Sequence, residues 1–85
     1  MSGVTRPIEV SDRATALAAR PYAISTTYDA ADGCFIARVE EFPHLIGAED
    51  TPVAAEAVLR EAIAIAIEGM LRRGHSVPEP QRATA

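Results

Sequence analysis

The sequence predicts a two-layer α+β domain in which a three-stranded antiparallel meander packs on one long C-terminal helix (β-β-β-α). Three observations lead to this prediction. Two short segments rich in β-branched and aromatic residues flank an Asp-Gly turn, a third short apolar segment follows a Phe-Pro break, and an alanine-rich stretch of helical period fills residues 51–74. A sheet with one such helix buries one face of each element against the other.

The long helix is the most strongly marked element. Thr51 is placed to cap its first turn, and Pro52 takes the first helical position, where the missing N–H costs nothing. Gly74 is placed for a left-handed C-terminal cap, and Pro78 lies beyond it. At about 100° per residue, one broad apolar face emerges, which we expect to lie on the sheet. Its members are Ala55, Val58, Leu59, Ala62, Ile63, Ala66 and Met70.

A second, narrower stripe on this helix has steps of three and four residues, the spacing of a helix–helix seam. Its members, with one arginine interrupting the apolar residues, are Val53, Ala57, Arg60, Ala64, Ile67 and Leu71. One interpretation is a surface helix whose alanines serve helix propensity alone. The other is a buried seam in a homo-oligomer, because Ile67 and Leu71 would otherwise face water one turn apart.

The three strands are predicted at Tyr22–Tyr28, Cys34–Glu40 and Leu45–Glu49. Residues 29–33 form the first hairpin loop, in which Gly33 can adopt a positive φ. Residues 41–44 break the second strand at a proline.

Upstream of the strands, Ser11 is placed to cap a short helix over residues 12–20 that ends ahead of Pro21. Its only large apolar residue is Leu17, so we expect it to dock weakly or to belong to an interface. The chain is thus divided into a tail with this helix at 1–20, loose over 1–10, a domain at 21–80 and a disordered end at 81–85.

Composition narrows the classes of function. Of the 85 residues 48% are apolar, but with two Tyr, two Phe and no Trp the core is thin, so we expect a dimer or tetramer. The net charge of −4 argues against direct contact with nucleic acid and suits a basic protein partner. The single cysteine, Cys34, fits a reducing cytoplasm, and no apolar run predicts a membrane span.

Chemistry-bearing residues do not form a recognisable catalytic pattern. The middle of the first strand has no acid, His44 and His75 lie in separate loops, and no serine or threonine sits on a sharp turn beside a base. We therefore expect no enzyme activity and no catalytic, cofactor or metal site.

Several local patterns fall in one order over residues 22–80. They are YDAADG at 28–33, FIARV at 35–39, EEFP at 40–43, Asp50-Thr51, Glu61-Ala62-Ile63, and a Gly-x-x-Val-Pro-x-Pro series ending at Pro80. The series resembles the HicB-like antitoxin domain of bacterial toxin–antitoxin pairs. The resemblance implies a truncated RNase H-like fold without catalysis, which binds a small basic ribonuclease toxin and covers its catalytic histidine. Full-length relatives add a C-terminal DNA-binding segment. This chain stops at Ala85, about where that segment would begin, so we expect no operator binding by this chain itself.

The sequence departs from the family pattern at loops that would face a partner. The family commonly has Pro-Gly-Cys where this chain has Pro43-His44-Leu45, and Gly-Asp-Thr where it has Glu49-Asp50-Thr51. A glutamate in the first helical turn of the family is Ala54 here, which removes half of a capping box.

The remaining candidate site is an acidic surface on the hairpin and loops, suited to a basic partner. Its predicted members are Asp29, Asp32, Glu40, Glu41, Phe42, His44, Glu49 and Asp50, with Phe42 as the desolvated anchor. In the alternative interpretation these acids are only solvated and Phe42 plugs the core. The sequence thus predicts an antitoxin-like, non-catalytic binding domain, and the alternative is an orphan homo-oligomeric structural or ligand-binding module.

Overall fold

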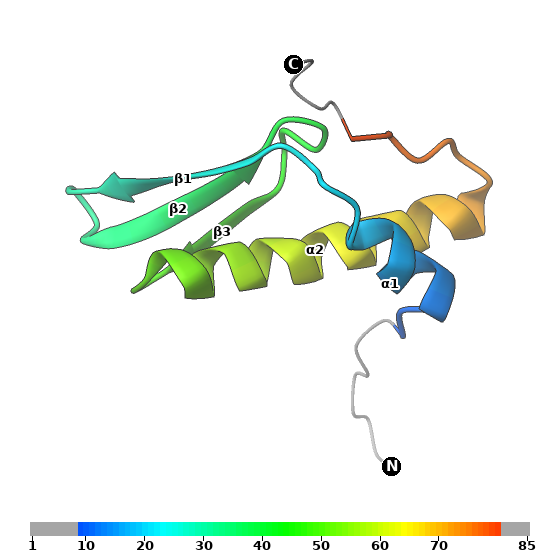
Figure 1. Cartoon of the computed structure of the whole chain (residues 1–85), viewed down its shortest axis with the longest axis horizontal. Helices are drawn as coiled ribbons and strands as arrows, with labels where there is room; N and C mark the ends of the chain where they lie inside the picture. The colour runs from blue at the N-terminus through cyan, green and yellow to red at the C-terminus, as the bar shows by residue number, and fades with distance from the viewer. Residues whose placement is uncertain (1–8, 81–85) are drawn as a thin grey trace, which may run out of the picture.

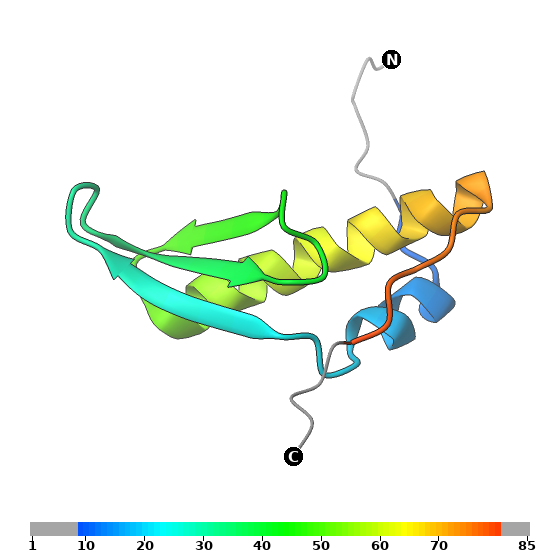
Figure 2. The ribbon, with the colours of Figure 1, turned by 90° about the horizontal axis from the view of Figure 1, so that it is seen from above.

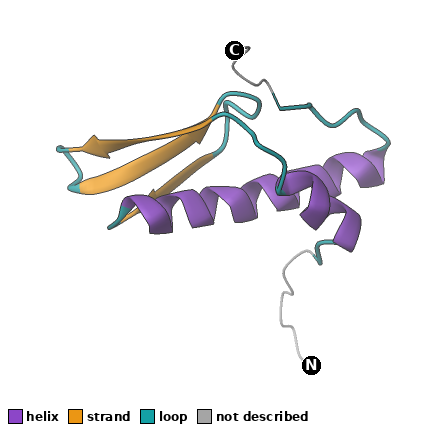
Figure 3. Cartoon of the chain, viewed as in Figure 1, coloured by secondary structure: helices purple, strands orange, loops and turns teal. Residues whose placement is uncertain are grey.

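A computed structural model describes residues 9–80, so the expectations for residues 1–8 and 81–85 lie outside the described part of the chain. The elements are α1 (Asp12–Ala18), β1 (Ile24–Asp29), β2 (Cys34–Val39), β3 (Ile46–Glu49) and α2 (Pro52–Arg73). The sheet has the order β1-β2-β3 with both pairs antiparallel, and α2 lies along one face of it (Figure 1). The predicted α+β arrangement of a meander on one long helix, preceded by a short helix, is confirmed (Figure 3).

Capping residues at both ends of α2 define where the helix begins and ends. The Thr51 hydroxyl accepts a hydrogen bond from the Ala54 N–H at 3.1 Å. At the other end Gly74 adopts a φ of 71°, and the His75 N–H donates to the Met70 carbonyl at 2.8 Å. These are the caps that the sequence predicts, so the helix starts and ends where expected.

Strand starts differ from the prediction where backbone groups bond outside the ladder. The Tyr22 N–H donates to Arg20 and the Ile24 N–H donates to Tyr22, so β1 begins at Ile24 and not at Tyr22. Likewise the Leu45 N–H donates to the Phe42 carbonyl in a turn, and β3 begins one residue later than predicted.

Register places the first half of α2 directly on the sheet. Ala37 of β2 pairs with Thr26 of β1 and Gly47 of β3, so these residues share the face that meets the helix. A Cβ atom at Gly47 would collide with the Ala55 carbonyl oxygen, and the two backbones therefore approach as closely as only glycine allows.

The short helix α1 packs beside the second half of α2 (Figures 1 and 2). Its Ser11 cap accepts from the Ala14 N–H at 3.1 Å, as predicted. It docks through Ala14 and Ala18, which are 0% and 6% exposed, whereas Leu17 is only half-buried. The helix therefore contributes to the same core as residues 21–80.

One predicted seam residue is corrected by this packing. Ile67 is 0% exposed and belongs to the core cluster of the chain itself. The prediction that Ile67 would face water without an oligomer partner is wrong, because α1 adds to the core over this half of α2. Leu71, its neighbour on the stripe, is half-buried against the same core.

Candidate protein-binding surfaces

Four of the eight predicted surface residues gather at one end of the sheet. Asp29 and Asp32 lie in the β1–β2 hairpin, while the pairing of Glu49 with Phe35 brings the end of β3 and Asp50 to the same place. The Asp29 carboxylate accepts from the Ala31 N–H at 3.0 Å, which fixes the loop. We call Asp29, Asp32, Glu49 and Asp50 the hairpin-end acids.

The thiol of Cys34 lies close to these acids and is affected by their charges. Desolvation by partial burial, and then the nearby charges of Asp29, Asp32, Asp50 and Glu49, raise the pKa of the Cys34 thiol. Both effects, the desolvation and then the negative charges, disfavour a reactive thiolate at this cysteine. Within residues 9–80, no arginine forms an ion pair with any of the hairpin-end acids.

The other four predicted residues follow β2 and lie at the opposite end of the sheet. β2 separates the two ends by about 17 Å, at the usual rise of an extended strand. Glu40 and His44 are exposed there. Since the eight residues divide between two ends, they do not make one continuous surface.

Two of these four residues are structural. Phe42 is 1% exposed, and its ring meets that of Tyr22 edge-on at 5.3 Å between centroids. The prediction of Phe42 as an interface anchor is wrong, and its alternative as a core plug is confirmed. Glu41 is buried, and its carboxylate accepts from the Ala23 N–H at 3.1 Å, which holds the start of β1.

The six residues of the predicted helix seam also divide. Val53 is 79% exposed and Ala57 is exposed, whereas Ile67 lies in the core. Arg60 and Ala64 line a groove between α1 and α2. The stripe is therefore not a uniform seam, and its middle is the part that faces a concave surface.

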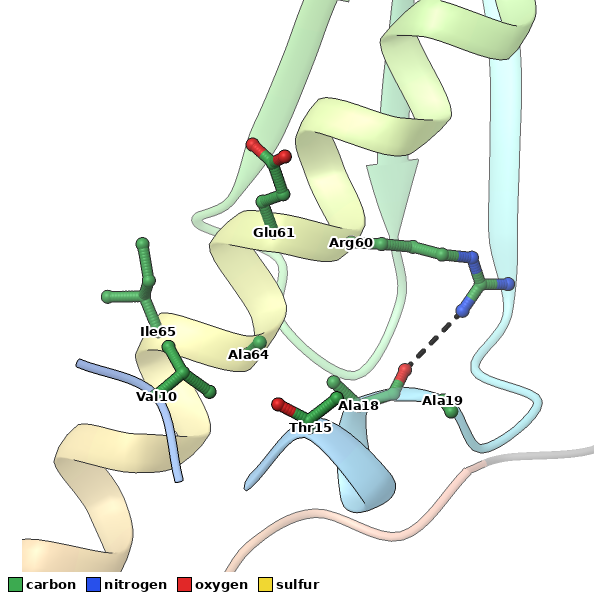
Figure 4. Close-up of a pocket in the computed structure, with 8 residues that line it drawn as sticks. All are labelled: Val10, Thr15, Ala18, Ala19, Arg60, Glu61, Ala64 and Ile65. Carbon is green, nitrogen blue, oxygen red and sulfur yellow. Dashed lines mark hydrogen bonds between the residues drawn. The ribbon is translucent and has the colours of Figure 1, made fainter. Parts of the chain in front are cut away.

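This groove has a volume of about 500 Å³ (Figure 4). From the N-terminal side it is lined by Val10, Thr15, Ala18 and Ala19. From α2 it is lined by Arg60, Glu61, Ala64 and Ile65. The small alanine side chains on both walls leave the hollow open.

A hydrogen bond at one end of the groove ties its two walls together. The Arg60 guanidinium donates to the Ala18 carbonyl at 3.4 Å (Figure 4). The same guanidinium pairs with Glu56 at 3.2 Å. At the other end of the groove Ile65, also on α2, is 42% exposed, although it is a large apolar residue. Ile65 belongs to neither of the two apolar faces that we predicted from the helical period. An apolar residue outside both faces was the sequence feature that could have indicated an additional contact.

Among residues 9–80, no group of three or more His, Cys, Asp or Glu side chains is arranged to hold a metal ion. His44 and His75 are both exposed and lie in different loops. Neither helix in this part of the chain is both long and apolar enough to cross a lipid bilayer.

Comparisons with models of protein families, with curated proteins and with solved structures give no significant match. The functional argument therefore depends on the two surfaces described above, the hairpin-end acids and the groove between α1 and α2.

Proposed function

We propose that this chain is a non-catalytic protein-binding domain that uses the hairpin-end acids to contact a basic protein. The single observation that carries the proposal is the convergence of four carboxylates from the hairpin and the β3–α2 connection, none of them in an ion pair with an arginine of residues 9–80. Four like charges at one end repel each other in the free domain. A basic partner relieves that repulsion and is steered toward it.

The partner class comes from the resemblance of the sequence to HicB-like antitoxin domains. On that basis the partner is a small basic ribonuclease toxin, which this domain neutralises by covering its active site in the cytoplasm. The compartment fits a free cysteine that carries no disulfide. The core position of Phe42 moves the expected contact away from the β2–β3 loop and onto the hairpin end.

The test begins with the gene neighbourhood: the proposal expects a small basic protein to be encoded beside this chain, and that protein is then co-expressed with it. The wild-type chain should form a complex with that protein and relieve its toxicity to growth. The double variant Asp32→Lys/Glu49→Lys should bind it on the order of tenfold more weakly, with a reduced dependence of affinity on salt.

The matched control is Glu40→Lys/Glu79→Lys, which makes the same charge change at exposed sites away from the hairpin end. It should retain binding. Equal losses in both variants would show that only net charge matters, and would remove the hairpin end as the contact. Failure of the wild-type chain to form a complex or relieve toxicity would refute the antitoxin role.

A second candidate is favoured by the groove between α1 and α2. In this alternative the chain is an orphan homo-oligomeric module with a structural or ligand-binding role. A stable homo-oligomer from an isolated gene, with no captured basic protein, would support this candidate over the first.

A further inference from the structure

The groove between α1 and α2 lies beside a side chain of the kind that could fill it. Four large apolar side chains of residues 9–80 are strongly exposed, namely Tyr28, Ile46, Val53 and Ile65. Only Ile65 lines the groove, and Ala18, Ala19 and Ala64 leave space next to it. A protruding apolar group beside a matching hollow is the arrangement that a self-complementary contact requires.

The charges at the groove suit a second copy of this chain better than a basic partner. Its lining carries one positive side chain, Arg60, and one negative side chain, Glu61. Two copies with a net charge of −4 each would repel at the hairpin end, where four acids gather. The groove lining carries one charge of each sign, so two copies meet there with less repulsion than at the hairpin end. Glu61 of one copy can face Arg60 of the other, which also pairs with Glu56 of its own copy.

We propose that two copies of the chain associate through this groove, with Ile65 of each copy inserted into the groove of the other. The contact is isologous: the same α1–α2 surface is used on both copies, related by a twofold axis that passes between the two α2 helices near Ala64. Burial of Ile65 and of the alanine walls supplies the apolar contact that the thin core of one copy lacks.

This interface is separate from the surface for a basic partner. Ile65 lies 13 residues along α2 from Pro52, which corresponds to about 20 Å of helix from the end that follows the hairpin-end acids. A dimer formed through the groove therefore leaves both acidic ends free. A variant that no longer dimerises can therefore still be tested for binding of a basic partner, and a variant that no longer binds the partner can still be tested for dimerisation.

The experiment is sedimentation equilibrium on the full chain. The wild-type protein should have twice the chain mass at micromolar concentration. Ile65→Glu on one wall and Ala19→Glu on the other should each weaken association on the order of tenfold or more, because each places a charge in the contact. Circular dichroism should show a folded monomer, since both side chains are exposed in the single copy.

The matched control is Val53→Glu, which makes a related apolar-to-acidic change on the same helix at a more exposed position outside the groove. It should remain a dimer. A monomeric wild-type chain, or an unchanged dimer in Ile65→Glu, would overturn the proposal. A wild-type monomer that dimerises only after removal of residues 1–8 would overturn it too, because that segment would then be the occupant.

Discussion

The two halves of α2 are buried in different ways. The first half lies on the sheet, and Ala55, Leu59 and Ile63 are each 0% exposed there. Its contact with β3 is a contact between backbones, since a Cβ at Gly47 would lie 2.9 Å from the Leu59 nitrogen. Such a contact has no flexible side chain that can adjust, so this half of the fold is intolerant of added volume.

The second half is held by small side chains and hydrogen bonds. Glu68 accepts from the Ser11 N–H at 2.9 Å and from Arg72 at 2.9 Å, and Arg72 also donates to the Glu9 carbonyl at 3.3 Å. Between these bonds and the Arg60–Ala18 bond the groove stays open. We infer that α1 opens at a lower free energy than the sheet does, and that this adaptable half is where a second copy docks.

The largest expected effect separates two isoleucines on the second half. Ile67→Arg should destabilise the fold by about 5 kcal/mol, because it removes a core side chain and places an unpaired charge where exposure is 0%. Ile65→Arg, two residues earlier and 42% exposed, should lower the melting temperature far less, because it leaves the core of each copy intact and removes only the contact with a second copy. Thermal unfolding of both variants measures the difference. A cooperative wild-type-like melt of Ile67→Arg would mean that α1 does not cover this half of the helix.

A smaller loss of stability is expected where β3 packs on the first half of α2. Gly47→Ala should cost on the order of 3 kcal/mol, since its methyl group meets the Ala55 carbonyl and the Leu59 nitrogen. The φ angle of Gly47 is not positive, so strain of the backbone itself does not enter. Urea denaturation with an unchanged m-value would report the loss as one of stability alone.

The matched control for Gly47 lies on the other half of the helix. A Cβ at Gly69 meets only the flexible end of Arg73, at 3.3 Å. Gly69→Ala should therefore stabilise the protein by up to about 1 kcal/mol through helix propensity. If both alanine variants were equally stable, the contrast between a rigid and an adaptable half would be lost.

Features encoded by neighbouring residues were predictable from the sequence. Thr51, Pro52 and Gly74 fix the ends of α2 through bonds within a few residues, and the Asp-Gly hairpin fixes the first two strands. The grouping of the hairpin-end acids follows from the meander as well, because the β1–β2 hairpin and the β3–α2 connection must lie at one end of the sheet. The same topology puts Glu40 and His44 at the other end, and the predicted single surface ignored that consequence.

Features that depend on distant contacts were not predictable. Ile67 shares its core cluster with Ala14 and Ala18 of α1, and α1 docks through these two alanines and a hydrogen bond from the Ser11 N–H to Glu68, 57 residues away. The spacing of apolar residues along α2 reveals neither the alanine contacts nor this hydrogen bond. Phe42 is likewise buried by Tyr22 from a remote segment, and a loop phenylalanine before a proline has the same local sequence in either role.

Protonation of Glu68 should release α1 without unfolding the sheet. The hydrogen bonds from the Ser11 backbone and hydroxyl, and then the one from Arg72, lower the pKa of Glu68 to about 2 from its ordinary value of 4.5. A carboxylate with a lowered pKa binds fewer protons in the folded than in the unfolded state, so stability rises with pH across this window. Its contribution should be complete above about pH 4.5 and lost as the pH falls toward 2.

Glu68→Gln removes this charge at every pH, so it should speed amide hydrogen exchange in α1 at pH 7 and flatten the acid limb of the stability profile. The matched control is Glu56→Gln, because Glu56 and Arg60 are also four residues apart but are 45% and 39% exposed, against 9% for Glu68. An exposed pair of this kind contributes only about 0.3 to 0.5 kcal/mol. Exchange in α1 should therefore respond to Glu68→Gln far more than to Glu56→Gln. Equal responses would mean that the alanine contacts alone hold α1, and that the hydrogen bonds to Glu68 do not distinguish the second half of α2 from the first.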